Sequence, residues 1–279
     1  MNIKELIINE NIKAKKKFGQ NFLIDGNVLT NIVTKADIKN KNVIEIGPGL
    51  GSLTEYLIKD AKKVVSYEID TDMVDILTKR YNNNDVVTIL HQDFLKVNLK
   101  EDIYKYFKDE EVIVVANLPY YITTAILTKI LEETKQVKRI VVMVQKEVAM
   151  RLSGKPSTKD YNSLSVLIQY YTNVKILFNV SPKSFIPAPE VDSSVILIEQ
   201  KDKLEEVLNE SYFLKFNRMI FAQRRKTLSN NLKQGFKYNQ EVINKILEQN
   251  NLSLSVRAES LTVNQIVKLS NDFYKEHIN

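Results

Sequence analysis

The sequence predicts an α/β fold over its first two thirds, with a smaller all-helical domain after it. Short apolar runs alternate with segments of helical period, which is typical of a parallel sheet with helices on both faces. The runs are almost purely apolar, as expected for strands covered on both sides. Beyond about residue 201 the strand-like runs stop and helical spacing takes over. We therefore expect two domains, 1–200 and 201–279.

The elements of the first domain follow in order along the chain. The expected strands are 42–46, 64–69, 86–90, 111–117, 139–144, 174–180 and 193–200. The expected helices lie near 53–60, 73–81, 125–133, 146–152 and 163–171. The last two strands are joined by a segment that three prolines interrupt.

Helical spacing in the second domain is carried by two apolar faces. One consists of Val242, Ile243, Ile246 and Leu247, and the other of Ile266, Leu269 and Phe273. Gln265 stands three residues after Thr262, which predicts a capping box at the start of the last helix.

The composition indicates a soluble globular protein. Hydrophobic residues make up 44% and charged residues 27%, and no apolar run approaches the roughly 18 to 20 residues that cross a bilayer. The first residues lack the apolar region of a signal peptide, so we expect a cytoplasmic protein without a membrane partner.

The supply of metal-ligating and thiol residues restricts the chemistry. The absence of cysteine excludes disulfides, thiolate nucleophiles and cysteine-ligated metals. His91 and His277 do not have the spacing of a multi-histidine site, so no metal is expected. The net charge of +6 favours a polyanionic partner.

A glycine-rich turn follows the first strand. Gly47, Gly49 and Gly51 permit a tight turn and a close approach of a ligand to the backbone. Ser52 stands where a dinucleotide fingerprint has its third glycine, which disfavours a nicotinamide cofactor. A simple strand-to-helix turn is the alternative.

Acidic residues end the next two strands. Glu68 is placed to accept the ribose hydroxyls of an adenosine, and Asp93 is placed to accept from an adenine amino group. Because ligands of such sheets bind at the carboxyl ends of the strands, the three features together resemble the cofactor site of S-adenosylmethionine-dependent methyltransferases. His91 is expected to be a packing or loop residue.

The fourth strand runs into Asn117, Leu118, Pro119 and Tyr120. An exocyclic adenine amine is a poor nucleophile, and two acceptors that hold its hydrogens would favour a pyramidal nitrogen. We expect the Asn117 amide oxygen and the Leu118 carbonyl to be these acceptors. Pro119 would orient that carbonyl by keeping Leu118 out of the helical region, and Tyr120 would stack on the base. An ordinary Asn-x-Pro turn is the alternative.

Seven segments in order resemble the KsgA family of small-subunit ribosomal RNA adenine dimethyltransferases. They are KKKFGQNFLID, EIGPGLGSLT, NLPYYITT, MVQKEVAMRL, FIPAPEVDSSV, FAQRRKTLSNNLK and RAESLT. The resemblance implies a Rossmann-like class I methyltransferase sheet and S-adenosylmethionine as cofactor. It also implies dimethylation of two adjacent adenosines in a hairpin loop near the 3′ end of 16S rRNA, on a late assembly intermediate of the small subunit.

The same resemblance assigns further site residues. Asn21 and Leu23 would belong to the cofactor site with Gly47, Gly49, Glu68, Asp93 and Asn117. Phe185 would flank the target base opposite Tyr120, whereas its residue type alone also fits a core position.

Two other functions stay open at this point. One is the antibiotic-resistance enzyme that dimethylates an adenosine of large-subunit RNA, and the other is a nucleic-acid-binding factor that uses the fold without catalysis. The segments after residue 220 favour the small subunit, and the intact glycine turn with Glu68, Asp93 and Asn117 favours retained catalysis.

Two basic clusters are candidate RNA contacts: Lys15, Lys16 and Lys17, and Arg224, Arg225 and Lys226. Such residues contact phosphates rather than base edges, so selectivity would come from the shape of the RNA and its unpaired loop. Solvated charged faces are the alternative. No dimer interface is evident, and a monomer is expected.

Overall fold

A seven-stranded sheet in the order β4-β3-β2-β5-β6-β9-β7 organises the first part of the chain. The computed structural model describes residues 3–9, 12 and 14–278. Within these, the strands of the sheet are β2 Asn42–Ile46, β3 Lys63–Glu68, β4 Val87–His91, β5 Val112–Asn117, β6 Val137–Gln145, β7 Thr172–Val180 and β9 Ser193–Gln200. Each of the seven expected strands is therefore present.

The direction of the strands differs from the expectation of a parallel sheet at one edge. β2 pairs in parallel with β3 and β5, β3 with β4, and β5 with β6. β9 pairs antiparallel with β6, with Arg139 opposite Glu199 and Gln145 opposite Ser193. The sheet is thus mixed, because an apolar run indicates a buried strand but not its direction.

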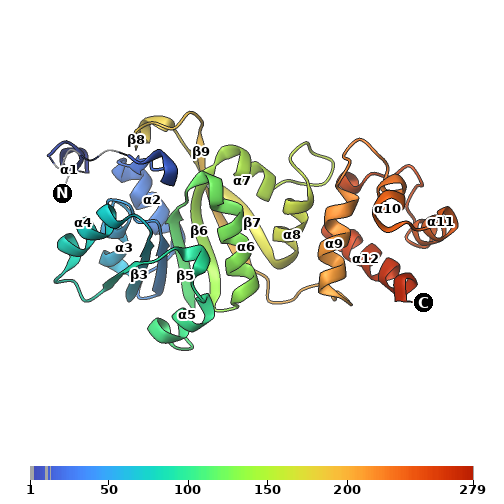
Figure 1. Cartoon of the computed structure of the whole chain (residues 1–279), viewed down its shortest axis with the longest axis horizontal. Coiled ribbons are helices and arrows are strands. Elements are labelled where there is room, and N and C mark those ends of the chain that lie inside the picture. Colours follow the sequence, from blue (N-terminus) through green and yellow to red (C-terminus); the bar gives the residue numbers. More distant parts are fainter. Residues whose placement is uncertain (1–2, 10–11, 13, 279) are drawn as a thin grey trace. The chain divides into compact units, whose positions relative to one another are not determined.

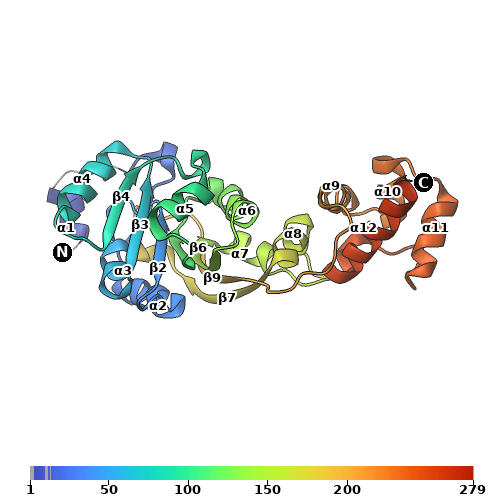
Figure 2. The same ribbon diagram turned by 90° about the horizontal axis from the view of Figure 1, so that it is seen from below.

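Helices cover both faces of this sheet, as predicted. Val43, Val64 and Ile113 pack on α2 and α3 in one apolar core, and strand alternation turns the neighbouring apolar residues to the other face. Figures 1 and 2 show α5 and α6 on that second face. The helices before β7 are α1 Ile3–Asn9, α2 Gly26–Ala36, α3 Thr54–Asp60, α4 Thr71–Tyr81, α5 Leu99–Phe107, α6 Thr123–Glu133, α7 Lys146–Leu152 and α8 Ser163–Tyr171.

A second, very short sheet joins the segment before the main sheet to the proline-interrupted segment. β1 Phe22–Leu23 pairs antiparallel with β8 Phe185–Ile186, with Leu23 opposite Phe185. Pairs of two residues have no periodicity, so the sequence pattern did not predict them.

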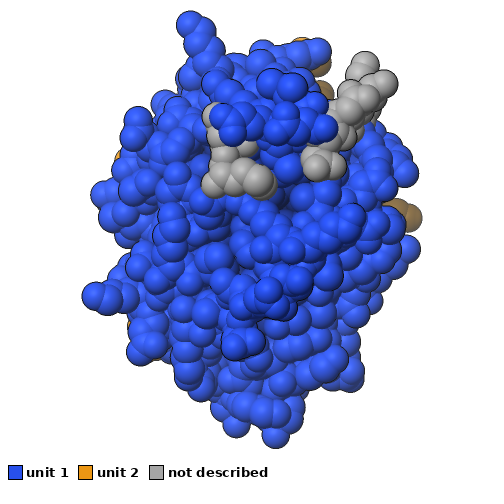
Figure 3. Space-filling view, turned by 90° about the vertical axis from the view of Figure 1, so that its left-hand side faces the viewer, with its two compact units in different colours: residues 1–149, 174–200 blue, residues 150–173, 201–279 orange. Residues whose placement is uncertain are grey.

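The contacts divide the chain into two compact units, coloured in Figure 3. The first comprises residues 1–149 and 174–200, and the second comprises 150–173 and 201–279. The expected domains instead place 150–173 with the first part. Those residues belong to the second unit because Tyr161 and Tyr170 pack in its aromatic core, where the Tyr170 ring centroid lies 5.0 Å from that of Phe213.

After β9 the described structure is helical, as expected. The helices are α9 Glu210–Ile220, α10 Leu228–Phe236, α11 Gln240–Gln249 and α12 Val263–Ile278. The predicted capping box is present: Thr262 N donates to Gln265 Oε1 at 2.9 Å, and Gln265 N donates to Thr262 Oγ1 at 3.3 Å. None of the described helices has both the length and the apolar character that a membrane span requires.

Candidate active site

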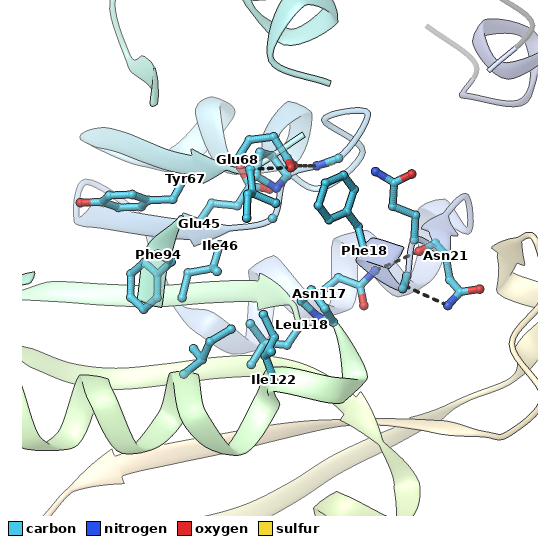
Figure 4. Close-up of a pocket in the computed structure, with 18 of the residues that line it drawn as sticks. Phe18, Asn21, Glu45, Ile46, Tyr67, Glu68, Phe94, Asn117, Leu118 and Ile122 are labelled. Atoms are coloured by element: carbon cyan, nitrogen blue, oxygen red, sulfur yellow. Dashed lines mark hydrogen bonds between the residues drawn. The ribbon is translucent and has the colours of Figure 1, made fainter. Parts of the chain in front are cut away.

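A cavity of about 290 Å³ opens at the carboxyl ends of β2, β3, β4 and β5. The ends of these strands and the loops after them supply most of its wall, and residues 18–23 and Ile126 supply the rest (Figure 4). All of its lining residues belong to the first unit. The cavity therefore lies where ligands of α/β sheets bind.

The glycine turn forms one wall of the cavity. Gly47, Gly49 and Gly51 have φ angles of 66°, 57° and 77°, which L-residues with a Cβ rarely adopt. A Cβ on Gly51 would lie 2.9 Å from the Leu77 side chain of α4. The same helix holds the turn, because Tyr81 Oη donates to the Gly51 carbonyl at 3.2 Å.

The Glu68 carboxylate is hydrogen-bonded to the glycine turn (Figure 4). Its Oε2 accepts from Gly49 N at 2.9 Å, and its Oε1 accepts from Ile69 N at 2.8 Å and Asp70 N at 2.9 Å. Burial raises the pKa of Glu68, and these backbone donors oppose that shift. Among the described residues Oε2 has Gly49 as its one donor, so it retains capacity for a ligand hydroxyl.

Asp93 also lines the cavity, directly after β4. It caps the short 3₁₀ helix Phe94–Lys96 through Oδ1, which accepts from Leu95 N at 3.0 Å. His91 lies outside the lining and is exposed, with Nε2 3.4 Å from Thr71 Oγ1. His91 is thus the last residue of β4, opposite Glu68 of β3, and is neither the loop residue nor the packing residue that was expected.

Glu45 is a cavity residue that the sequence reading missed. It is the next-to-last residue of β2, is 1% exposed, and accepts from Thr54 Oγ1 and Ser66 Oγ at 2.8 Å each through Oε2. Its Oε1 is buried without a hydrogen-bond partner in the described structure. Burial raises the pKa of this carboxyl to about 7. A carboxylate inside an otherwise apolar strand was the available signal, since isolated buried charges are costly.

The loop after β5 brings the predicted reaction residues to the cavity. Asn117, Leu118, Pro119 and Tyr120 all line it. Asn117 Nδ2 donates to the backbone oxygen of Asn21 at 3.3 Å, which turns the amide oxygen away from that contact. Tyr120 is partly buried, and its hydroxyl lies 2.8 Å from Ser193 Oγ.

The segment before β1 closes the cavity on the side facing Asn117 (Figure 4). Phe18, Gly19, Gln20 and Asn21 line it, as does Leu23. The structure thus gathers each predicted cofactor residue, Asn21, Leu23, Gly47, Gly49, Glu68, Asp93 and Asn117, around one cavity.

Phe185 is not among the lining residues. Its pairing opposite Leu23 turns it into the core shared with α2, and it is 3% exposed. The structure therefore does not bring Phe185 together with Tyr120 in the cavity wall, and a contact with the target base stays a prediction.

The fold and this constellation can be compared with known proteins. The family model described as ribosomal RNA adenine dimethylase matches residues 11–271. The chain belongs to this family. It is 47% identical to the ribosomal RNA small subunit methyltransferase A of Bacillus cytotoxicus. The match covers 96% of this chain and 94% of that protein. The protein of the same name from Bacillus pumilus is 45% identical over 98% of this chain and 95% of its own.

Two solved structures share the fold of this ribosomal RNA adenine dimethylase family member. A dimethyladenosine transferase from Plasmodium falciparum has a TM-score of 0.75 and 25% identity, covering 92% of this chain and 98% of that one. The 23S rRNA methyltransferase ErmE has a TM-score of 0.69 and 23% identity, and the match covers 90% of this chain and 99% of that one. The predicted family, enzyme class and fold class are thereby confirmed.

The basic residues of this dimethylase family member are in different situations. Lys15 forms ion pairs of 2.6 Å with Asp70 and Asp72. The Lys16 side chain lies outside the described part of the chain. Lys17 is exposed, with Nζ 4.5 Å from the centre of the Phe18 ring. The amino-terminal cluster is therefore not a uniform cationic face.

The residues of the second basic cluster, 224–226, also differ in their contacts. Arg224 Nε donates to Glu259 at 2.8 Å, and Nη2 donates to the Thr158 carbonyl at 3.2 Å. Arg225 and Lys226 are exposed beside it. Among the described residues, no group of three or more histidine or acidic side chains is placed to hold a metal ion.

Proposed function

We propose that this chain uses S-adenosylmethionine to dimethylate the exocyclic amino groups of two adjacent adenosines in a hairpin loop near the 3′ end of 16S rRNA. The observation that carries the proposal is that Asn117 of the NLPY segment shares a cavity with Glu68, Asp93 and the glycine turn. The relatives named small subunit methyltransferase A support the choice of subunit.

The chemistry of the cavity fits this cofactor. S-adenosylmethionine is cationic at sulfur and at its α-amino group, and the buried Oε1 of Glu45, which has no hydrogen-bond partner among the described residues, offers an acceptor oxygen in the wall. Glu68 Oε2 would accept from a ribose hydroxyl, and Asp93 would accept from the adenine amino group. Asn21 and Leu23 would close the site over the methionine part.

When bound, the cofactor supplies an electrophilic methyl group. The adenine nitrogen would take this methyl group, and the electron pair of the broken carbon–sulfur bond would stay on sulfur. In the first transfer to each adenosine, the Asn117 amide oxygen and the Leu118 carbonyl would accept the two amine hydrogens and orient the nitrogen lone pair toward the methyl carbon. The substituted nitrogen then loses one proton to water, so no strongly basic residue is required.

Exposed cations would hold the RNA by its phosphates. Lys17 in the first unit, and Arg225 and Lys226 in the second, have free access to solvent. We assign them to phosphate contacts with the small subunit or its assembly intermediate, which would link the modification to ribosome biogenesis. The protein would act as a monomer in the cytoplasm.

The experiment incubates the protein and radiolabelled S-adenosylmethionine with small or large ribosomal subunits from a strain that lacks these modifications. We expect dimethyladenosine label in 16S rRNA of the small subunit. Label in the large subunit would replace the proposal with the resistance-enzyme function. Tight subunit binding without label in either would instead indicate a binding factor.

A further inference from the structure

A buried carboxylate ties the amino-terminal segment to the cofactor cavity. The Asp70 side chain is 2% exposed. Its Oδ1 accepts from Lys15 Nζ at 2.6 Å, and its Oδ2 accepts from Gln20 Nε2 at 2.8 Å. Gln20 Oε1 in turn accepts from Lys15 N at 2.8 Å, so Lys15 and Gln20 are also joined to each other.

These bonds fix both sides of a stretch that forms part of the cavity wall. Phe18 and Gly19 lie between Lys15 and Gln20, and Asn21 follows directly; all three line the cavity. A segment without long regular structure is held mainly by such contacts, because it has few ladder bonds of its own.

The same carboxylate is connected to the glycine turn. Asp70 N donates to Glu68 Oε1 at 2.9 Å, and Glu68 Oε2 accepts from Gly49 N at 2.9 Å. A continuous path of hydrogen bonds therefore runs from the glycine turn through Glu68 and Asp70 to Lys15 and Gln20. Displacement of the segment would therefore alter the surroundings of Glu68 and Gly49, which both line the cavity.

Helix capping alone does not account for this arrangement. Asp70 is the N-cap of α4 and accepts from Asp72 N at 3.2 Å, a role that needs neither Lys15 nor Gln20. Burial acts to raise the pKa of Asp70, but the hydrogen bonds from Lys15 and Gln20 hold it below its ordinary value. Lys15 also pairs with exposed Asp72 at 2.6 Å, so its ammonium faces two carboxylates.

We propose that Lys15, Gln20 and Asp70 form a latch that positions residues 15–21 over the cofactor cavity and thereby sets cofactor affinity. Lys15 is then a positioning residue and not a phosphate contact. The inference rests on the proposed function for the identity of the ligand. Its mechanical part, that the latch holds the segment, does not.

The first measurement needs no ligand. Amide hydrogen exchange is followed at residues 17–23 in the wild type and in Lys15→Met and Asp70→Asn. Asparagine caps a helix as well as aspartate does, so Asp70→Asn removes the charge and spares α4. We expect faster exchange in both variants, and wild-type exchange in Lys41→Met, which breaks an exposed ion pair with Asp37 away from the cavity. Unchanged exchange in Lys15→Met and Asp70→Asn would overturn the latch.

The second measurement is the dissociation constant for S-adenosylhomocysteine by calorimetry. We expect Lys15→Met and Asp70→Asn each to raise this constant about tenfold, and the variant that combines them to raise it little further. Lys15→Arg should stay within about threefold of the wild type. The KM for S-adenosylmethionine should rise while kcat at saturation changes less than about twofold.

The outcomes separate the two proposals. A wild type that binds no S-adenosylhomocysteine while the variants still accelerate exchange would count against the proposed function and uphold the latch. A wild-type dissociation constant in Lys15→Met, with a reduced salt dependence of subunit binding, would overturn the latch and restore Lys15 as an RNA contact.

Discussion

The Asn117 side chain donates from Nδ2 to the backbone oxygen of Asn21 at 3.3 Å, across 96 residues of sequence. One amide therefore joins the reaction loop to the segment that closes the cavity. Because this contact uses the NH₂ group, the Asn117 oxygen is left to accept from an adenine amine.

Replacement of Asn117 with alanine should lower the methyl-transfer rate by about 10² to 10³, since it removes a preorganised polar contact to the reacting nitrogen. Single-turnover methylation of small subunits measures this effect. Asn117→Asp keeps an acceptor oxygen but loses the donor to Asn21, so it should weaken cofactor binding and retain more of the rate. Near-normal turnover in Asn117→Ala, with subunit binding intact, would remove Asn117 from the reaction.

Tyr120 allows its ring and its hydroxyl to be tested separately. The hydroxyl lies 2.8 Å from Ser193 Oγ, which fixes the ring beside the cavity. Tyr120→Ala should lower turnover about 5- to 150-fold, the range that base stacking supplies. Tyr120→Phe and Ser193→Ala should each cost less, and by similar amounts, because both remove the same bond. Equal losses in Tyr120→Phe and Tyr120→Ala would show that stacking contributes nothing.

Phe185→Ala should destabilise the protein by about 3 to 5 kcal/mol, as deletion of a buried aromatic ring usually does. The reason is its place in the core beside Leu23, at 3% exposure. Denaturant unfolding measures the loss, and Phe185→Leu should lose less. A stability equal to the wild type together with collapsed turnover would instead support the contact with the target base that the sequence predicts.

The covered strands of the sheet could be predicted because their burial on both faces leaves almost no polar positions. Their direction could not, and β9 runs antiparallel to β6 for that reason. The place of residues 150–173 depends on long-range aromatic packing around Tyr161, which a local pattern does not encode.

Site residues could be predicted where a polar side chain that suits the ligand stands at the carboxyl end of a strand, as Glu68, Asp93 and Asn117 do. Lys15 shows the limit of that reasoning. Its partner Asp70 lies 55 residues away in sequence, so a run of lysines gives no sign that one of them is bound internally. Glu45 was missed because its role depends on burial that only the packed strand creates.

The exposed cations of the helical unit should account for part of the salt dependence of subunit binding. Alanine at Arg224, Arg225 and Lys226 together should flatten the plot of log affinity against log salt, because fewer counterions are released. Arg224→Ala alone should leave the slope unchanged, since Arg224 is paired with Glu259. Lys138→Ala, an exposed lysine at the amino end of β6, is the matched control. An unchanged slope in the triple variant would remove this cluster from the interface.

Glu45 should make stability depend on pH. Its pKa is about 7 in the folded protein against 4.5 for an ordinary glutamate, because burial disfavours the charged form. Between these values the folded state holds a proton that the unfolded chain lacks. The free energy of unfolding therefore falls as the pH rises from 4.5 toward 7, and above that the contribution is fully lost.

Glu45→Gln removes this dependence, because glutamine does not titrate and its oxygen can still accept from Thr54 and Ser66. We expect the variant to gain about 2 to 3 kcal/mol relative to the wild type between pH 5 and pH 8. Urea unfolding at both pH values measures the difference, in which other titrating groups cancel. Glu199→Gln, which replaces a partly exposed carboxylate paired with Arg139, is the control for loss of a negative charge alone. If the two variants changed equally with pH, the Glu45 carboxyl would titrate as an ordinary glutamate and would be ionised in the folded protein.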